Sequence, residues 1–102
     1  MRGMGNMQNI ARQMQKMQKE MGKVQETLDQ QVFTATAGQV VTVTFTGNKK
    51  LQEVKIDPVA LDPEDAETVE DLLVVAINDA LNQIEETTQK TMGKYTKGMP
   101  GF

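Results

Sequence analysis

The first third of the chain carries apolar residues at alternating spacings of three and four. They occupy the first and fourth positions of successive heptads, at Met7, Ile10, Met14, Met17, Met21, Val24 and Leu28. This period is typical of an α-helix with a narrow apolar seam of the coiled-coil type. We therefore predict a helix over residues 6–30. Its seam should be soft, because methionine side chains are unbranched and adapt to irregular neighbours.

The pattern changes to strict alternation between residues 31 and 57. Three short apolar runs, QVFTATAG, QVVTVTFTG and LQEVKIDP, are separated by glycine-containing turns, and the third is stopped by Pro58. Connections this short predict an antiparallel three-stranded meander. In the second run Val41, Val43 and Phe45 share one face, and in the third run Val54 and Ile56 are expected to point inward.

A second long helix is predicted over residues 62–92. Asp62 is suited to the N-cap and Pro63 to the first helical position, and the following acids favour the positive end of the helix dipole. The stretch VEDLLVVAINDAL is apolar over more than half the circumference, so it should pack on the sheet and on a second surface. The Gly-rich residues 93–102 are expected to form a flexible tail.

These elements predict one α+β domain over residues 1–102 with the order α-β-β-β-α. Both helices are longer than a three-stranded sheet is wide, so they should project beyond it. With 102 residues, 38% hydrophobic and 4% aromatic, the chain can build only a thin aliphatic core, which favours a homodimer. The candidate core and dimer residues are Val41, Val43, Phe45, Val54, Ile56, Leu72, Leu73 and Ile77.

Missing residue types exclude several kinds of chemistry. The chain has no His, Cys, Ser or Trp, so catalysis by a Ser-His or Cys-His pair and zinc binding by imidazole or thiolate are impossible. It also lacks the phosphate-binding glycine loops and the calcium-loop pattern, and we interpret the acids near residue 62 as capping groups. We predict a protein that is not an enzyme, with no cofactor, metal or small-molecule substrate.

No apolar run approaches the roughly 20 residues that a membrane-spanning helix needs, and no signal peptide is recognisable at the start. We therefore expect a cytoplasmic protein that does not bind membranes.

Charge is unevenly distributed behind the formal net charge of −3. Residues 1–28 contain five basic residues against two acids, residues 57–86 contain ten acids and no base, and residues 87–102 contain three lysines and no acid. A fold that brings the two chain ends together would create a positive region on a negative body. Such a local field, rather than the bulk charge, attracts a polyanion.

The basic residues of the first helix lie opposite its apolar seam. A solvated helix face is one interpretation of such a charge run. However, Lys19 and Lys23 are like charges one turn apart, which repel by about 0.2–0.5 kcal/mol. A polyanion would relieve this repulsion. The candidate residues for contact with a polyanion are Arg12, Lys16, Lys19, Lys23, Lys90, Lys94 and Lys97.

Four segments in order resemble the YbaB/EbfC family of bacterial nucleoid-associated proteins: MGNMQNIARQMQKMQKEM, VTVTFTGNKKLQEVKIDP, VEDLLVVAINDALNQIEE and KTMGKYTKGMPGF. The resemblance implies a tweezer-like homodimer whose helical prongs reach outward from a body of sheets and second helices. It also implies a cytoplasmic, nucleoid-associated protein that binds duplex DNA and alters its conformation. The prong cations named above would then contact DNA, although the family has no sharply defined contact motif.

Two other interpretations remain open at this point. Helix, hairpin and helix is also the layout of prefoldin-type subunits, so a tentacle-like chaperone or coiled-coil adaptor could use Met7, Met14 and Met17 to hold unfolded clients. A regulatory subunit of a replication or repair machine is a third possibility.

Overall fold

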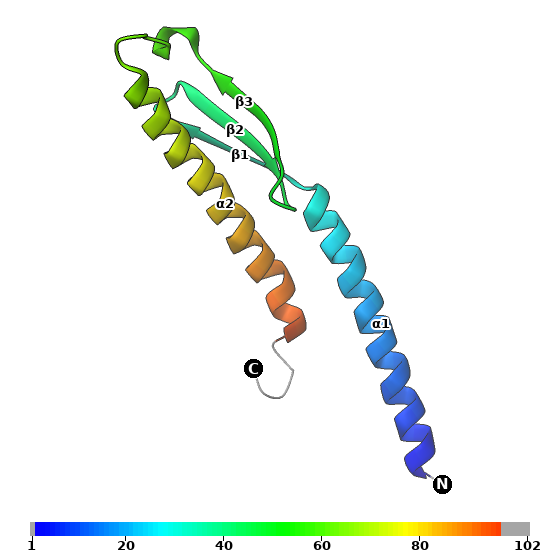
Figure 1. The fold of residues 1–102 in the computed structure, drawn as a ribbon. Helices are drawn as coiled ribbons and strands as arrows, with labels where there is room; N and C mark the ends of the chain where they lie inside the picture. The colour runs from blue at the N-terminus through cyan, green and yellow to red at the C-terminus, as the bar shows by residue number, and fades with distance from the viewer. Residues whose placement is uncertain (1, 97–102) are drawn as a thin grey trace.

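The computed structural model describes the backbone of residues 2–96 and the side chains of residues 7–93. In chain order its elements are α1 (Arg2–Gln30), β1 (Val32–Ala37), β2 (Val41–Thr46), β3 (Leu51–Ile56), the 3-10 helix Pro58–Ala60 and α2 (Ala66–Thr96). The predicted α+β class and α-β-β-β-α order are confirmed. The molecule is elongated, with extents of 79 × 23 × 14 Å, and both helices project from the same end of the sheet (Figure 1).

The three strands form one antiparallel sheet in the order β1-β2-β3. In its register Phe33 pairs with Phe45 and Ala35 pairs with Val43, while on the other side of β2 Val43 pairs with Val54. The β1–β2 turn has positive φ at its two central residues, 58° at Gly38 and 61° at Gln39. This turn geometry matches the right-handed twist of the strands it joins.

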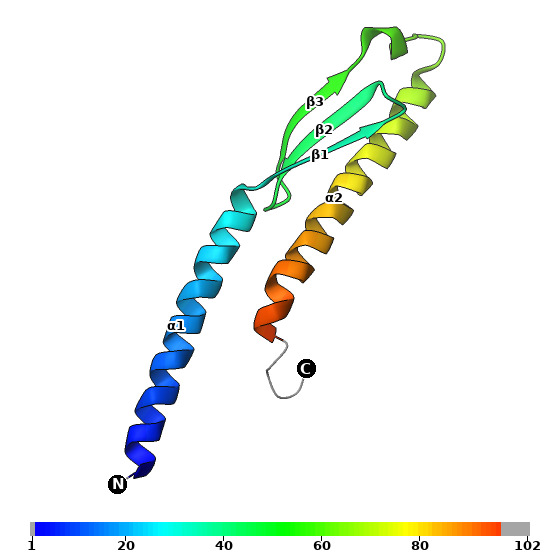
Figure 2. The ribbon, with the colours of Figure 1, turned by 180° about the vertical axis from the view of Figure 1, so that it is seen from behind.

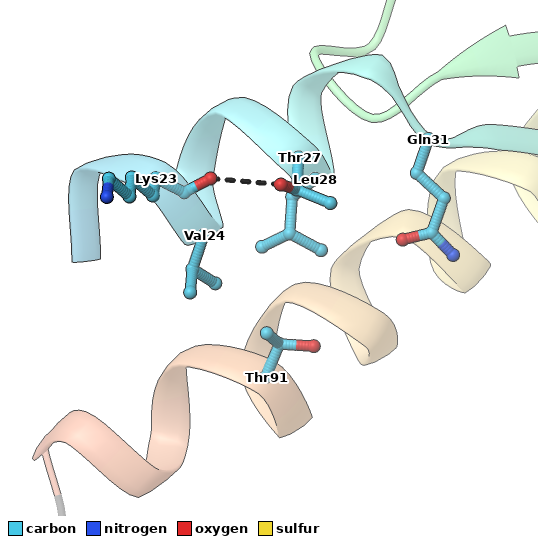
Figure 3. Close-up of a pocket in the computed structure, with 6 residues that line it drawn as sticks. All are labelled: Lys23, Val24, Thr27, Leu28, Gln31 and Thr91. Carbon is cyan, nitrogen blue, oxygen red and sulfur yellow. Dashed lines mark hydrogen bonds between the residues drawn. The ribbon is translucent and has the colours of Figure 1, made fainter. Parts of the chain in front are cut away.

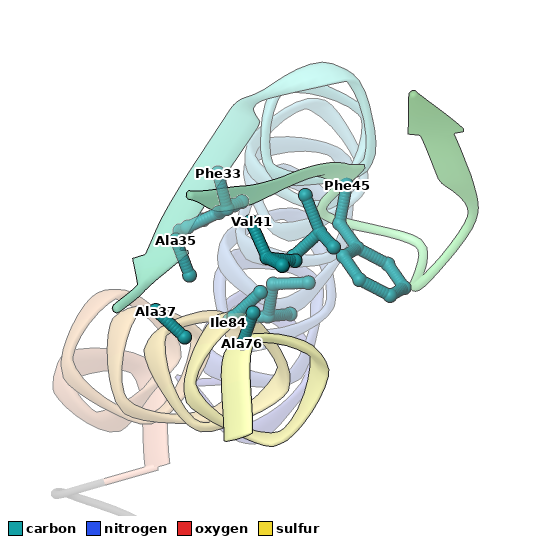
Figure 4. Packing of buried hydrophobic residues seen from close by; sticks show 9 residues of the cluster. Phe33, Ala35, Ala37, Val41, Phe45, Ala76 and Ile84 are labelled. Atoms are coloured by element: carbon teal, nitrogen blue, oxygen red, sulfur yellow. The ribbon is translucent and has the colours of Figure 1, made fainter. Parts of the chain in front are cut away.

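The core lies between α2 and one face of the sheet. Alternate residues of β1 and β2 point to α2, whose buried stripe includes Ala76, Ala80 and Ile84 (Figure 4). Ala35 and Ala37 on β1 face the helix with equally small side chains, so the helix can lie close to the strands. The fully buried large side chains in the described range are Ile84, Val41 and Val43.

Most of the candidate core residues take part in this packing. Val41, Val43 and Phe45 are buried, and four more are partly buried against the cluster: Ile56, Leu72, Leu73 and Ile77. Val54 is the exception, since its exposed fraction is 40%. Its side chain shares the face of Val43, but α2 packs on β1 and β2, and Val54 on β3 lies beyond it.

The expected start of the second helix is wrong. The helix begins at Ala66, directly after Asp65, whose carboxylate accepts a hydrogen bond of 2.8 Å from the Thr68 hydroxyl. Asp62 instead accepts the Glu64 backbone N–H at 2.9 Å within a separate turn. Both acids can cap a helix, and the turn uses the first one. At the other end the helix continues to Thr96, so residues 93–96 do not belong to a flexible tail, and residues 97–102 lie outside the described range.

The α1 helix runs antiparallel to α2 and touches the rest of the molecule near its C-terminus (Figures 1 and 2). Leu28 is buried, and Met21 and Val24 are partly buried. Toward the N-terminus the seam is uncovered, with exposed fractions of 71% at Met7 and 57% at Met14. Within the described residues, neither helix is long and apolar enough to cross a membrane.

We predict that Ile84→Ala lowers the free energy of unfolding by about 2–5 kcal/mol, because it leaves a cavity where α2 meets the sheet. Urea denaturation followed by circular dichroism measures this change. The control is Val59→Ala at a position 80% exposed, which should shift stability by less than about 0.5 kcal/mol. Similar effects of the two substitutions would contradict the placement of the core.

Candidate nucleic-acid interface

The outer segment of α1, residues 7–23, carries two distinct faces. One is the uncovered apolar seam, and the other is the basic stripe, which consists of Arg12, Lys16, Lys19 and Lys23. All four side chains of the basic stripe are exposed. At the rise of an α-helix they extend over about 16 Å. Successive phosphates on one strand of duplex DNA advance by about 3.4 Å along its axis, so the stripe matches a run of several phosphates.

The cations of the basic stripe are not neutralised by the protein. Among side chains of residues 7–93, the ion pair within 4 Å is between Lys55 and Glu53 on β3, at 3.3 Å. Glu20 lies one turn from Lys16 but is not within that distance. The stripe therefore keeps its positive charges available to a ligand in solution.

The α1 and α2 helices approach each other around a hollow of about 310 Å³ (Figure 3). Its walls are Lys23, Val24, Thr27 and Leu28 of α1, Gln31 of the connection, and Thr91 of α2. The Thr27 hydroxyl is not free, because it donates to the Lys23 carbonyl oxygen at 3.0 Å. The junction between the two helices is thus incompletely filled.

Among the candidate cations of α2, the structure places only Lys90 in full. It is exposed and precedes Thr91, so it lies near the inner end of the basic stripe. The backbone of Lys94 belongs to α2, but its side chain is outside the described range, as is all of Lys97. The fold therefore brings the end of α2 alongside α1, while Arg12 and Lys16 lie farther out along the projecting helix (Figure 1).

Two further exposed cations, Lys49 and Lys50, were missed by the sequence interpretation. They lie in the β2–β3 turn, and Lys49 lines a hollow together with Asp29 of α1 and Glu85 of α2. Among the described side chains, neither carboxylate lies within 4 Å of the Lys49 ammonium group. Two adjacent lysines in a predicted hairpin turn could have been recognised from the sequence as exposed cations, because such turns lie on the surface.

The opposite end of the molecule is acidic. The acidic end comprises residues 57–71 and carries seven carboxylates and no basic residue. It lies where the sheet and the start of α2 meet, far from the N-terminus of α1 (Figure 2). The charge blocks seen along the sequence are thus separated in space along the longest dimension, so a polyanion is attracted to one end and repelled from the other. No group of acids in the described range is arranged to hold a metal ion.

Comparison with known proteins shows the family of this chain. A model of the YbaB/EbfC DNA-binding family matches residues 4–99. The chain belongs to this family. A nucleoid-associated protein of Enterococcus faecalis is 53% identical over 103 residues, covering 100% of this chain and 99% of the relative. One from Streptococcus pyogenes is 48% identical over 98 residues, covering 95% and 99%. These names describe DNA-binding, nucleoid-associated proteins rather than enzymes.

The fold is also found in a solved structure. The crystal structure of uncharacterized protein HP0035 from Helicobacter pylori superposes with a TM-score of 0.71 at 28% sequence identity, covering 87% of this chain and 94% of that one. The elongated helix–sheet–helix arrangement is therefore shared by a protein in which most residues differ.

We predict that changing Lys16, Lys19 and Lys23 together to Gln leaves the free energy of unfolding within about 0.5 kcal/mol of wild type. The substitutions remove no ion pair within 4 Å, and they relieve the like-charge repulsion between Lys19 and Lys23. Urea denaturation measures the effect. A large loss of stability would show that these lysines have partners within the protein.

Proposed function

We propose that this YbaB/EbfC-family chain forms a homodimer that binds duplex DNA non-catalytically and with low sequence specificity. By holding DNA it alters the conformation of the duplex, and so contributes to nucleoid organisation and gene regulation in the bacterial cytoplasm. The family match and the names of the relatives support a DNA partner at the nucleoid. The observation that carries the proposal is the basic stripe, exposed and unpaired, at the end of the molecule remote from the acidic end.

Binding in this scheme is driven by contacts between cations and phosphates. Lysine and arginine displace counterions condensed on the duplex, which favours association at low salt. Phosphate contacts position the protein without reading the bases. The glutamines at positions 8, 13, 15, 18 and 25 are the polar neighbours of the stripe, and neutral amides add little electrostatic attraction. Low sequence specificity follows.

Uncovered apolar surface supports self-association. On the part of the sheet that α2 leaves uncovered, Leu51 and Val54 of β3 have exposed fractions of 47% and 40%. On α2 itself, Val74 and Val75 are both 58% exposed. A second copy packed on these residues would bury apolar surface that one small domain cannot cover. The dimer would then present two projecting α1 helices to one duplex.

Two projecting helices also explain how binding would alter DNA. Cations held at a fixed separation favour duplex segments whose phosphates meet both helices at once. Where the phosphates of straight DNA do not reach both helices, the duplex must bend or twist. Such a deformation costs a few kcal/mol, which phosphate contacts can offset. In this proposal the dimer acts on DNA through the spacing of its two α1 helices rather than through recognition of bases.

A second candidate function rests on the apolar seam. Met7, Ile10 and Met14 are 71%, 55% and 57% exposed, which suits a chaperone that holds unfolded segments between soft helices. Suppression of the aggregation of a test protein, insensitive to added DNA, would favour this function. DNA binding without such suppression would favour the proposal above.

For the DNA-binding dimer we predict steep salt dependence. With about six to eight phosphates neutralised, a plot of log K against log salt concentration should have a slope near −5 to −7. Fluorescence anisotropy with random-sequence duplex at several salt concentrations measures it, on protein whose mass in solution is first established by light scattering. A slope near zero, or a monomeric mass, would contradict the corresponding part of the proposal.

The lysine-to-glutamine triple variant at positions 16, 19 and 23 should weaken binding equally on duplexes of different sequence. The slope should also become shallower by about 0.9 for each phosphate that the variant no longer neutralises. The matched control is Lys55→Gln, which removes one lysine that is already paired with Glu53 on the sheet. Wild-type affinity in the triple variant would exclude the basic stripe from the interface.

A further inference from the structure

The β2–β3 turn makes an unusually close contact with the end of α1. A Cβ atom added at Gly47 would lie 1.6 Å from the Leu28 carbonyl oxygen and 2.6 Å from its carbonyl carbon. These are backbone atoms, which cannot rotate away as a flexible side chain would. Glycine is not required here by a left-handed φ, in contrast to Gly38 in the other turn, so the requirement at Gly47 is steric.

The contact is also hydrogen-bonded. The Gly47 N–H donates to the Gln31 carbonyl oxygen at 2.9 Å, directly after the last residue of α1. The turn is closed on itself, because the Thr46 N–H donates to the Lys50 carbonyl oxygen and the Lys49 N–H donates to that of Thr46, both at 2.9 Å. A closed turn bonded to the end of a helix transmits the orientation of the sheet to that helix.

The same turn lies against α2. Gly47 and Asn48 line a hollow of about 280 Å³ whose other walls include Asp29 of α1 and Ile84 and Thr88 of α2. The turn therefore lies between the C-terminal end of α1 and the part of α2 around Ile84 and Thr88. The direct α1–α2 contact around Val24 and Thr91 also borders a hollow, of about 310 Å³.

We propose that Gly47 is a positioning residue that sets the direction in which α1 projects, and so the separation of the basic stripes in the DNA-binding dimer. This inference rests on the proposed function. Real Cβ atoms essentially never come within 3.0 Å of another heavy atom, but a Cβ at position 47 would lie 1.6 Å from the Leu28 carbonyl oxygen. The carbonyl group would therefore have to move away by about 1.4 Å. Taken up over the last helical turn, about 5.4 Å long, this shift tilts α1 by about 15°.

The projecting helix amplifies the tilt. Arg12 lies 16 residues before Leu28, a distance of about 24 Å along the helix. A tilt of about 15° therefore moves Arg12 by about 6 Å, which exceeds the 3.4 Å axial step between phosphates of one strand. The stripe on each helix stays intact, but the two stripes no longer meet one duplex in register.

The test compares Gly47→Ala with Gly22→Ala. Gly22 lies within α1 and has no atom within 4 Å of an added Cβ, so its substitution should leave the direction of the helix unchanged. Because the chain has no native cysteine, Gln13→Cys and Asn82→Cys allow a spin label on each helix. Mixing labelled chains with excess unlabelled protein before pulsed electron resonance restricts the measurement to distances within one chain.

For Gly47→Ala we expect the mean distance between the labels to shift by several ångströms. DNA binding should weaken and its salt slope should become shallower by about 2.5–3.5, the share expected when one of the two α1 helices no longer neutralises phosphates. Loss of folded protein alone would lower the active fraction but leave the slope unchanged. Gly22→Ala should keep the wild-type distance and slope. An unchanged distance in Gly47→Ala, or a shifted distance with wild-type affinity and slope, would overturn the inference.

If Gly47→Ala does not fold, one glycine inserted after Asn48 provides the second variant. It leaves Gly47 without a Cβ but breaks the closed turn, so the distribution of distances should broaden. A distribution as narrow as in wild type would overturn the inference. The proposed function fails separately, if wild-type protein shows no salt-dependent binding to DNA, and the distance measurement still tests the role of Gly47.

Discussion

The packing of one stripe of α2 onto β1 and β2 is the constraint on which the rest of the structure depends. Small side chains on both sides, such as Ala76 on the helix and Ala37 on the strand, let the two backbones approach each other. Farther along α2, Ile84 fills the space between the helix and the sheet. This contact uses most of the buried apolar surface of the chain. It leaves β3 partly uncovered and α1 attached only at its end, and these two features expose the surfaces that the proposed dimer and the proposed DNA contact would use.

A projecting helix with unpaired cations is costly to the protein and useful to a polyanion. The neighbouring lysines Lys19 and Lys23 of α1 repel each other by a few tenths of a kcal/mol, and no carboxylate of the described residues lies within 4 Å of either ammonium group. Seven of the fourteen carboxylates lie at the acidic end, away from the basic stripe. The net charge of −3 then coexists with a locally positive region, and overall acidity does not argue against a DNA partner.

Different parts of the fold attract DNA and set the direction of the helices that would hold it. In the proposal above, the basic stripe supplies the attraction for phosphates, whereas the turn between β2 and β3 decides whether two stripes can meet one duplex at once. The soft Met-rich seam and the incompletely filled α1–α2 junction contribute little rigidity. The proposed function, shaping DNA without reading bases, needs such a division, because the spacing of the contacts decides which duplex conformations are favoured.

The sequence by itself determined the order and type of the elements. A period of 3.5 residues, then one of two, then a broad helical face, predicts helix, meander and helix, because local periodicity reflects which side of each element is buried. The blocks of charge were equally visible, and they indicated which helix face carries cations. Four in-order segments also indicated the YbaB/EbfC family.

Only the tertiary structure decided matters that depend on distant neighbours. Asp62 and Asp65 are both capable caps, and the competing turn that selects the second one is not visible in local propensity. Val54 follows the apolar alternation but is exposed, because burial depends on how far α2 reaches across the sheet. The need for glycine at position 47 comes from a carbonyl 19 residues away, since steric contact between segments is set by how they pack and not by their own sequence.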